Sequence, residues 1–137
     1  MKKTVLLLTS LVLAACATTE DGAIHETDGI QDFVKMHNLE RVSVIRGFED
    51  PGVLFLDNPR YIIAYLRHDQ WLLQYAHECP LARLEPEYRP SDKRRNTRAL
   101  YVGTDTFRGC PVKTIWPIKL EHAQELVGMG REPGNEN

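Results

Sequence analysis

The densest group of charged side chains in the sequence is basic. Five cations stand within residues 89–98, offset nearby only by Glu85, Glu87 and Asp92, and cationic side chains at this density can bind phosphate or carboxylate groups. The cations are Arg89, Lys93, Arg94, Arg95 and Arg98. The segment predicts a possible anion-binding site formed by Arg94, Arg95 and Arg98. A solvated loop that keeps the domain soluble is the simpler interpretation of the same residues.

Two oppositely charged residues, Asp105 and Arg108, precede Cys110 in the segment DTFRGC. The pair can form a polar site for a small ligand. Aspartate and threonine also organise turns by bonding to the backbone, and glycine adopts backbone angles that other residues avoid. We therefore favour a turn that Asp105 and Thr106 organise and in which Arg108 bonds internally.

Residues suited to catalysis are sparse. Beyond residue 15 the serines are Ser43 and Ser91, and neither stands in a Gly-x-Ser-x-Gly turn. The sequence contains carboxylate pairs that could hydrolyse glycans and histidines that could serve in acid–base catalysis. Nothing in their spacing places them in one active site. These residues are Glu85 with Glu87, Asp69 with Glu78, and histidines 25, 37, 68, 77 and 122. We predict no catalytic residue and no cofactor.

Residues 1–15 have the composition of a secretory signal. Two lysines precede an apolar run from Val5 to Leu13, which is too short to span a bilayer and gives way to polar residues. The sequence LAAC, residues 13–16, resembles the lipobox of bacterial lipoproteins, where the leader is removed just before a cysteine that then carries lipid. The resemblance implies that Cys16 is lipidated, palmitate included. An ordinary signal peptide that is cut elsewhere is the alternative.

Acyl chains on Cys16 would anchor the protein to a membrane, since two or more chains make attachment effectively permanent. Ala17 follows Cys16 where an enterobacterial inner-membrane retention signal places aspartate. We therefore expect the bacterial outer membrane, with the protein facing the periplasm. Residues 16–27 are predicted to be the lipidated cysteine and a flexible tether.

If Cys16 carries lipid, two cysteines remain in the exported domain, Cys79 and Cys110. An oxidising compartment favours a disulfide between them. A bridge that closes a loop of this length contributes about 3–4 kcal/mol in the chain-entropy model. A redox pair or a metal site is the alternative. We predict no metal, because Cys79 in HEC lacks a second clustered pair of ligands.

Net charge and chain length restrict the classes of function that remain. The 137-residue chain has a formal net charge of −2, which becomes more negative when a leader with two lysines is removed, so general nucleic-acid binding is not expected. Residues 28–128 suffice for one domain, and residues 129–137 are predicted to be a disordered tail.

Six aromatic residues can line a groove, although most are more simply core residues. They are Tyr61, Tyr65, Trp71, Tyr75, Tyr101 and Trp116.

Hydrophobic spacing predicts a short helix from Asp28, with Asp28 and Gln31 resembling a capping box. Asn38 is predicted as a left-handed C-cap, after which Leu39 folds back on the apolar face of the helix. Strands are predicted in 41–48, 53–57, 60–67, 99–105 and 110–118, and 60–67 is apolar on both faces. Residues 70–78 suit a helix or a strand equally. Leu120, Ala123 and Val127 predict a second helix.

This order of elements predicts an α+β fold, in which a small antiparallel sheet is combined with a short N-terminal helix, a C-terminal helix and one disulfide.

Three segments between Ile30 and Ile118 resemble an uncharacterised family of proteobacterial lipoproteins with a domain of unknown function. They are IQDFVKMHNLERVSVIRGF, WLLQYAHECPLA and the most distinctive, DTFRGCPVKTIWPI, with its Asp-Thr-x-Arg-Gly-Cys motif. The resemblance implies an exported, lipid-anchored, disulfide-bearing domain and no particular activity. Pro111 departs from the family, which usually has a polar or basic residue there, and proline weakens the case for a hydrogen-bonded edge.

These features together predict a non-catalytic binding or accessory module of the cell envelope, attached to the membrane by lipid, with an envelope protein or anionic polymer as its partner. An inhibitor of a hydrolase such as lysozyme is the alternative, and a small hydrolase is less favoured.

Overall fold

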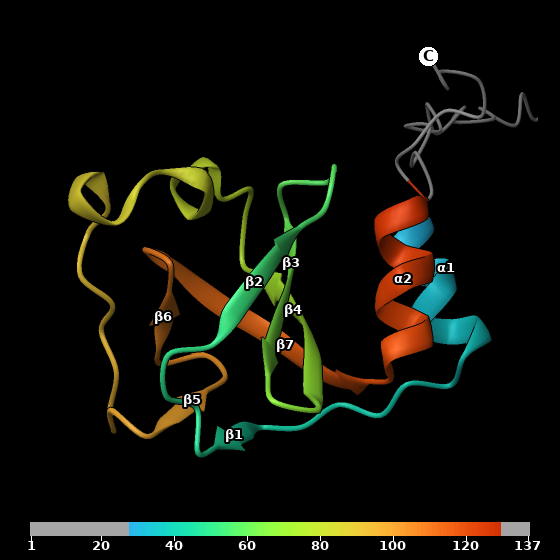
Figure 1. Ribbon diagram of the computed structural model, residues 1–137, viewed down its shortest axis with the longest axis horizontal. Helices are drawn as coiled ribbons and strands as arrows, with labels where there is room; N and C mark the ends of the chain where they lie inside the picture. Colours follow the sequence, from blue (N-terminus) through green and yellow to red (C-terminus); the bar gives the residue numbers. More distant parts are fainter. Residues whose placement is uncertain (1–27, 130–137) are drawn as a thin grey trace, which may run out of the picture.

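The computed structural model describes residues 28–129. Two helices flank seven strands and two short 3-10 helices along the chain (Figure 1). In order these are α1 (Gly29–Met36), β1 (Val44–Arg46), β2 (Gly52–Phe55), β3 (Tyr61–Leu66), β4 (Asp69–Tyr75), η1 (Pro80–Arg83), η2 (Pro86–Tyr88), β5 (Ala99–Tyr101), β6 (Thr106–Phe107), β7 (Cys110–Ile118) and α2 (Leu120–Gly128).

All strand pairs are antiparallel. Five strands form one sheet in the order β2-β3-β4-β7-β6, and β1 pairs with β5 in a separate ribbon. The predicted small α+β fold with antiparallel sheets and a helix near each end is confirmed. Within the described residues, no helix has the length and apolar character needed to cross a membrane.

The sheet separates two hydrophobic cores, because side chains alternate between its faces. On β3, Tyr61 and Ile63 pack in the core beneath the two helices, which lie side by side on one side of the sheet (Figure 1). Ile62 and Ala64 pack in the other core, together with residues of the β1–β5 ribbon and of η1. The prediction that 60–67 includes a strand buried on both faces is confirmed for Tyr61 to Ala64.

Residues 70–78 form a strand rather than a helix up to Tyr75. β4 is the middle strand of the five and bonds to β3 and β7 on its two sides. Leu72 faces the core beneath the helices, and Leu73 faces the opposite core. Because a strand buried on both faces has no polar side, the apolar run alone is ambiguous.

The ends of α1 largely follow their predicted chemistry. Asp28 accepts a hydrogen bond from the backbone N–H of Ile30 at 3.2 Å, and Asn38 has φ 49°. The N–H of Leu39 donates to the carbonyl of Val34, so the chain folds back as predicted. Gln31 does not complete a capping box, because its side-chain amide donates to the hydroxyl of Tyr61 on the sheet.

The buried face of α2 differs from the prediction. Ala123 and Leu126 are buried, whereas Leu120 is 61% exposed and Val127 is half-buried. The helix meets the sheet along the line of Ala123 and Leu126, so Leu120 and Val127 lie at the margins of the contact. Including Leu120 in the core was therefore wrong.

Candidate functional site

The predicted disulfide between Cys79 and Cys110 is present. Both cysteines are buried and their Cα atoms are 6.0 Å apart. Cys79 precedes η1 and Cys110 begins β7, so the bridge attaches the start of the irregular segment 80–98 to the sheet. The bridge leaves neither sulfur as a free thiolate for nucleophilic or metal chemistry.

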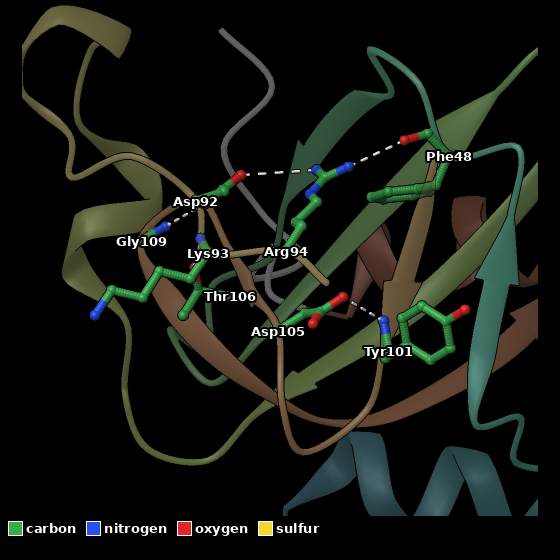
Figure 2. A network of polar contacts seen from close by, with 8 residues as sticks. All are labelled: Phe48, Asp92, Lys93, Arg94, Tyr101, Asp105, Thr106 and Gly109. Carbon is green, nitrogen blue, oxygen red and sulfur yellow. Dashed lines mark hydrogen bonds and ion pairs between the residues drawn. The ribbon is translucent and has the colours of Figure 1, made fainter. Parts of the chain in front are cut away.

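Asp105 points into the protein and holds backbone groups. Its Oδ1 accepts hydrogen bonds from the N–H of Arg95 at 3.2 Å and from the hydroxyl of Thr104 at 3.1 Å. Its Oδ2 accepts from the N–H of Tyr101 at 2.9 Å (Figure 2). Because only 1% of Asp105 is exposed, its acceptor capacity serves the turn between β5 and β6.

Arg108 lies apart from Asp105, and no ion pair between them occurs in residues 28–129. The Nε of Arg108 donates to the carbonyl of Ala82 in η1, as the internal-bonding interpretation expects. Its guanidinium carbon lies 5.2 Å from the ring centroid of Phe55. Burial lowers the pKa of Arg108, and the positive charge of Arg89 lowers that pKa further. The effect of Arg89 indicates that the two arginines lie near one another.

Of the three predicted anion-binding arginines, Arg94 is the most buried. Its Nη1 donates to the carbonyl of Phe48 at 3.0 Å, and its Nη2 lies 3.7 Å from a carboxylate oxygen of Asp92 (Figure 2). The guanidinium carbon also lies 5.1 Å from the ring centroid of Phe48 and 5.8 Å from that of Phe107. These contacts attach the basic segment to the domain and neutralise much of the charge of Arg94.

Arg95 and Arg98 point elsewhere. The guanidinium carbon of Arg95 lies 5.1 Å from the ring centroid of Tyr101, and Arg98 pairs with Glu49 through its Nε at 2.5 Å. The structure therefore does not place Arg94, Arg95 and Arg98 around one point. Their side chains find three separate partners because each arginine leaves an irregular segment in a different direction.

A cavity of about 580 Å³ opens beside Arg94, and we name it the arginine pocket. Arginines from the basic segment and from the β6–β7 turn line it together, which joins parts of the two predicted sites in one place. The lining residues are Phe48, Glu49, Asp50, Pro51, Arg89, Asp92, Arg94, Thr97, Phe107 and Arg108.

Two buried polar atoms near the arginine pocket have no hydrogen-bond partner among the described residues. They are the Nε of Arg89 and the hydroxyl of Tyr75. Burial raises the pKa of Tyr75 well above its usual value. The charge of Asp92 also raises this pKa, whereas the charges of Arg108 and Arg89 lower it. Buried polar groups usually have partners, so these two donors are exceptions, and neither atom is open to a ligand as the side chains stand.

The arginine pocket as a whole could not be predicted from the sequence. Phe48 and Phe107 were not singled out, and Arg89 and Arg108 were assigned to different features. No local signal joins these residues, since the pocket forms only when the β1–β2 turn, the basic segment and the β6–β7 turn meet.

The six aromatic residues proposed for a groove mostly belong to the cores. Tyr61, Tyr75 and Trp116 are at most 2% exposed, whereas Trp71 is half-buried and Tyr65 is 40% exposed. They therefore do not form one exposed surface.

The candidate acid–base residues are also dispersed. His37 and His122 stack between the helices with ring centroids 4.6 Å apart, and Glu85 and Glu87 are exposed around η2. In residues 28–129 no group of three or more His, Cys, Asp or Glu side chains is arranged to hold a metal ion.

Comparison with known proteins returns no match to any protein family, to any curated protein or to any solved structure.

Proposed function

We propose that the protein is a non-catalytic binding module of the bacterial cell envelope, and that the arginine pocket binds an anionic group such as a phosphate or a carboxylate. The ligand belongs to an envelope protein or an anionic envelope polymer. The anion lies against Arg89 and Arg108, whose planar guanidinium groups suit two-pronged bonding to an oxyanion.

The observation that carries this proposal is that the side chains of Arg89 and Arg108 line one pocket without an ion-pair partner in the described part of the chain. Asp92 offsets the charge of Arg94, whereas Arg89 and Arg108 form no ion pair within residues 28–129. An incoming anion would supply an acceptor for Arg89 and a counter-charge for both arginines.

The cellular setting is a further part of the proposal and is supported by the sequence. Residues 1–27, which include the leader, Cys16 and the tether, lie outside the described residues. We place Cys16 in the outer membrane as the lipid-bearing residue, with the domain facing the periplasm. The sequence LAAC at residues 13–16 and the alanine that follows it support this placement.

The pocket can be tested with inorganic phosphate and acetate as probes in isothermal titration calorimetry of the disulfide-bonded domain. Arg89→Gln should weaken binding by at least about tenfold, because a charge-assisted hydrogen bond is lost. Lys113→Gln is the matched control, since this exposed β7 residue lies outside the pocket but removes the same charge. Absence of binding, or equal affinity in Arg89→Gln and the unaltered protein, would overturn the proposal.

A further inference from the structure

A second hollow adjoins the arginine pocket. It has a volume of about 630 Å³, and we name it the Trp71 hollow. Three arginines and one half-buried tryptophan contribute to its wall. The lining residues are Arg46, Gly47, Glu49, Leu66, Arg67, Asp69, Trp71 and Arg98.

The two hollows meet at Glu49, which lines both of them. Glu49 pairs with Arg98, and the two side chains are 53% and 77% exposed. An exposed ion pair of this kind contributes only about 0–1 kcal/mol, so a ligand can displace it at low cost. The boundary between the hollows is therefore readily opened.

Three packed aromatic rings run beneath both hollows. Phe48 contacts Phe107 with ring centroids 5.3 Å apart and contacts Trp71 at 5.8 Å, in edge-to-face geometry. Phe48 and Phe107 line the arginine pocket, and Trp71 lines the neighbouring hollow. One cluster of packed aromatic rings therefore borders both hollows.

Both hollows contain carboxylates as well as arginines. Asp50 and Asp92 line the first hollow, Asp69 lines the second, and Glu49 lines both, with three arginines in each. A densely charged polymer such as a nucleic acid would meet repulsion from these carboxylates. A chain with spaced anionic groups and many hydroxyls fits better, because hydroxyls donate to carboxylates while the anions meet arginines. The half-buried ring of Trp71 adds an apolar surface with a polar edge, which suits a sugar ring.

We infer that the arginine pocket and the Trp71 hollow form one groove for an acidic polysaccharide, a sugar chain with carboxylate or phosphate groups at intervals. This inference rests on the proposed function, since the first anionic group occupies the arginine pocket. The chain then crosses Glu49, and a second sugar lies at Trp71 with its anionic group near Arg46 and Arg67.

The length of the sugar chain provides the test. Glucuronic acid and linear oligomers of two and six sugars, in which glucuronic acid alternates with neutral N-acetylglucosamine, can be titrated into the disulfide-bonded domain by calorimetry. The hexamer should bind at least about tenfold more tightly than the monomer, because the second hollow adds contacts to an already bound chain. The fluorescence of Trp71 should change with the hexamer and not with the monomer, and Trp71→Phe should remove that change.

Two variants separate the hollows. Arg46→Gln combined with Arg67→Gln should abolish the advantage of the hexamer and leave the affinity for the monomer unchanged. Arg89→Gln should weaken the binding of both the monomer and the hexamer. Arg41→Gln combined with Lys113→Gln is the matched control, since both residues are exposed and outside the hollows, and it should retain the advantage of the hexamer.

The possible outcomes distinguish the two proposals. If monomer and hexamer bind equally, the groove is refuted and the anion site in the arginine pocket stands. If neither acid binds and phosphate and acetate also fail, both proposals are wrong. Equal binding of neutral maltohexaose, or of a single-stranded DNA hexamer, would overturn the assignment to an acidic polysaccharide.

Discussion

At the scale of single residues, the segment 104–110 places its polar groups in structural roles. Asp105 accepts three hydrogen bonds, and the residues that follow it form the turn that leads into β7. Arg108 has φ 51° and Gly109 has φ 91°, so two consecutive residues adopt left-handed backbone. This turn positions Arg108 at the arginine pocket, which makes the pocket dependent on local backbone geometry.

Replacing Asp105 with alanine should lower the free energy of unfolding by about 2–4 kcal/mol, because the donors of Arg95, Tyr101 and Thr104 lose their acceptor. Urea denaturation followed by circular dichroism measures the change. Asp57→Ala is the control, since Asp57 is exposed. Equal stability of the two variants would contradict the structural role of Asp105.

Gly109→Ala should destabilise the domain by about 1–3 kcal/mol, because alanine at φ 91° is strained and its Cβ would lie 3.3 Å from the Cδ of Pro90. Gly128→Ala is the matched control, since Gly128 lies in α2 and an added Cβ would meet no atom within 4 Å. There alanine should stabilise the helix slightly. Thermal unfolding of both variants measures the difference, and a neutral Gly109→Ala would refute the strain.

At the scale of elements, the irregular segment 80–98 is attached to the sheet by the disulfide and by polar contacts. The N–H of Lys93 donates to the hydroxyl of Thr106 at 2.7 Å, and the N–H of Gly109 donates to Asp92 at 3.0 Å (Figure 2). Two lining arginines of the arginine pocket, Arg89 and Arg94, belong to this segment. Its attachment therefore determines the shape of the pocket.

Removal of the disulfide by Cys79→Ser combined with Cys110→Ser should lower the free energy of unfolding by about 3–4 kcal/mol, since the unfolded chain regains freedom. Phosphate binding should also weaken, because the bridge positions the start of the segment that supplies Arg89. Urea denaturation and calorimetry of the double variant measure the two effects. Unchanged stability would show that the bridge contributes nothing to the folded state.

The contact between α1 and the sheet predicts a dependence on alkaline pH. Tyr61 donates to Asp28 at 2.5 Å, and burial together with this hydrogen bond raises the pKa of Tyr61 from 10.0 to about 12. The folded state then retains a proton that the unfolded chain has lost. The free energy of unfolding should therefore fall as the pH rises from 10.0 to about 12.

Urea denaturation at a series of pH values measures this loss of stability. Tyr61→Phe should show a smaller decrease, because only the remaining groups, Tyr75 among them, still titrate differently in the two states. An identical decrease in Tyr61→Phe and the unaltered protein would contradict the assignment to Tyr61.

At the scale of the whole molecule, two cores on the faces of one sheet give a domain whose proposed binding surface is separate from its helices. The arginine pocket and the Trp71 hollow adjoin the core of the β1–β5 ribbon, since Phe48, Phe107 and Trp71 belong to or pack against that core. The helices cover the opposite face. The proposed lipid on Cys16 would then hold this binding surface near the membrane without taking part in it.

Labelling with palmitate tests the proposed anchor. Cys16→Ser should abolish incorporation of labelled palmitate and move the protein from the membrane fraction to the soluble fraction, because no acyl chain remains to bind the bilayer. Cys79→Ser combined with Cys110→Ser should retain the label. Palmitate that persists in Cys16→Ser would contradict lipidation at that residue.

Local chemistry was sufficient to predict much of the fold. The N-cap of Asp28, the left-handed Asn38 and the buried strand within 60–67 each depend on a few neighbouring residues, and all are confirmed, the strand for Tyr61 to Ala64. The disulfide was predicted because two cysteines remain once Cys16 is assigned to lipid, without any knowledge of distance. Export and lipidation at Cys16 remain predictions of the sequence.

Other features depend on register and on contacts between distant segments. Val112 and Ile115 face the same core although they are three residues apart, because the pairing of β4 with β7 shifts beside Tyr75. Strict alternation could not predict that shift. Likewise, Pro111 lies opposite Thr106 and its carbonyl accepts from Ala76, so the strand forms without a donor at that position.

By itself, the sequence determined the approximate positions of α1, α2, β1, β2, β3, β5 and β7, and which cysteines pair, whereas the short strand β6 was not predicted. Only the tertiary structure decided that 69–75 is a strand and that Arg89 and Arg108 share a pocket while Arg95 and Arg98 turn away. The physical reason is that periodicity reports a side chain's face within one element. A binding site depends instead on which loops the packing of the sheet brings together.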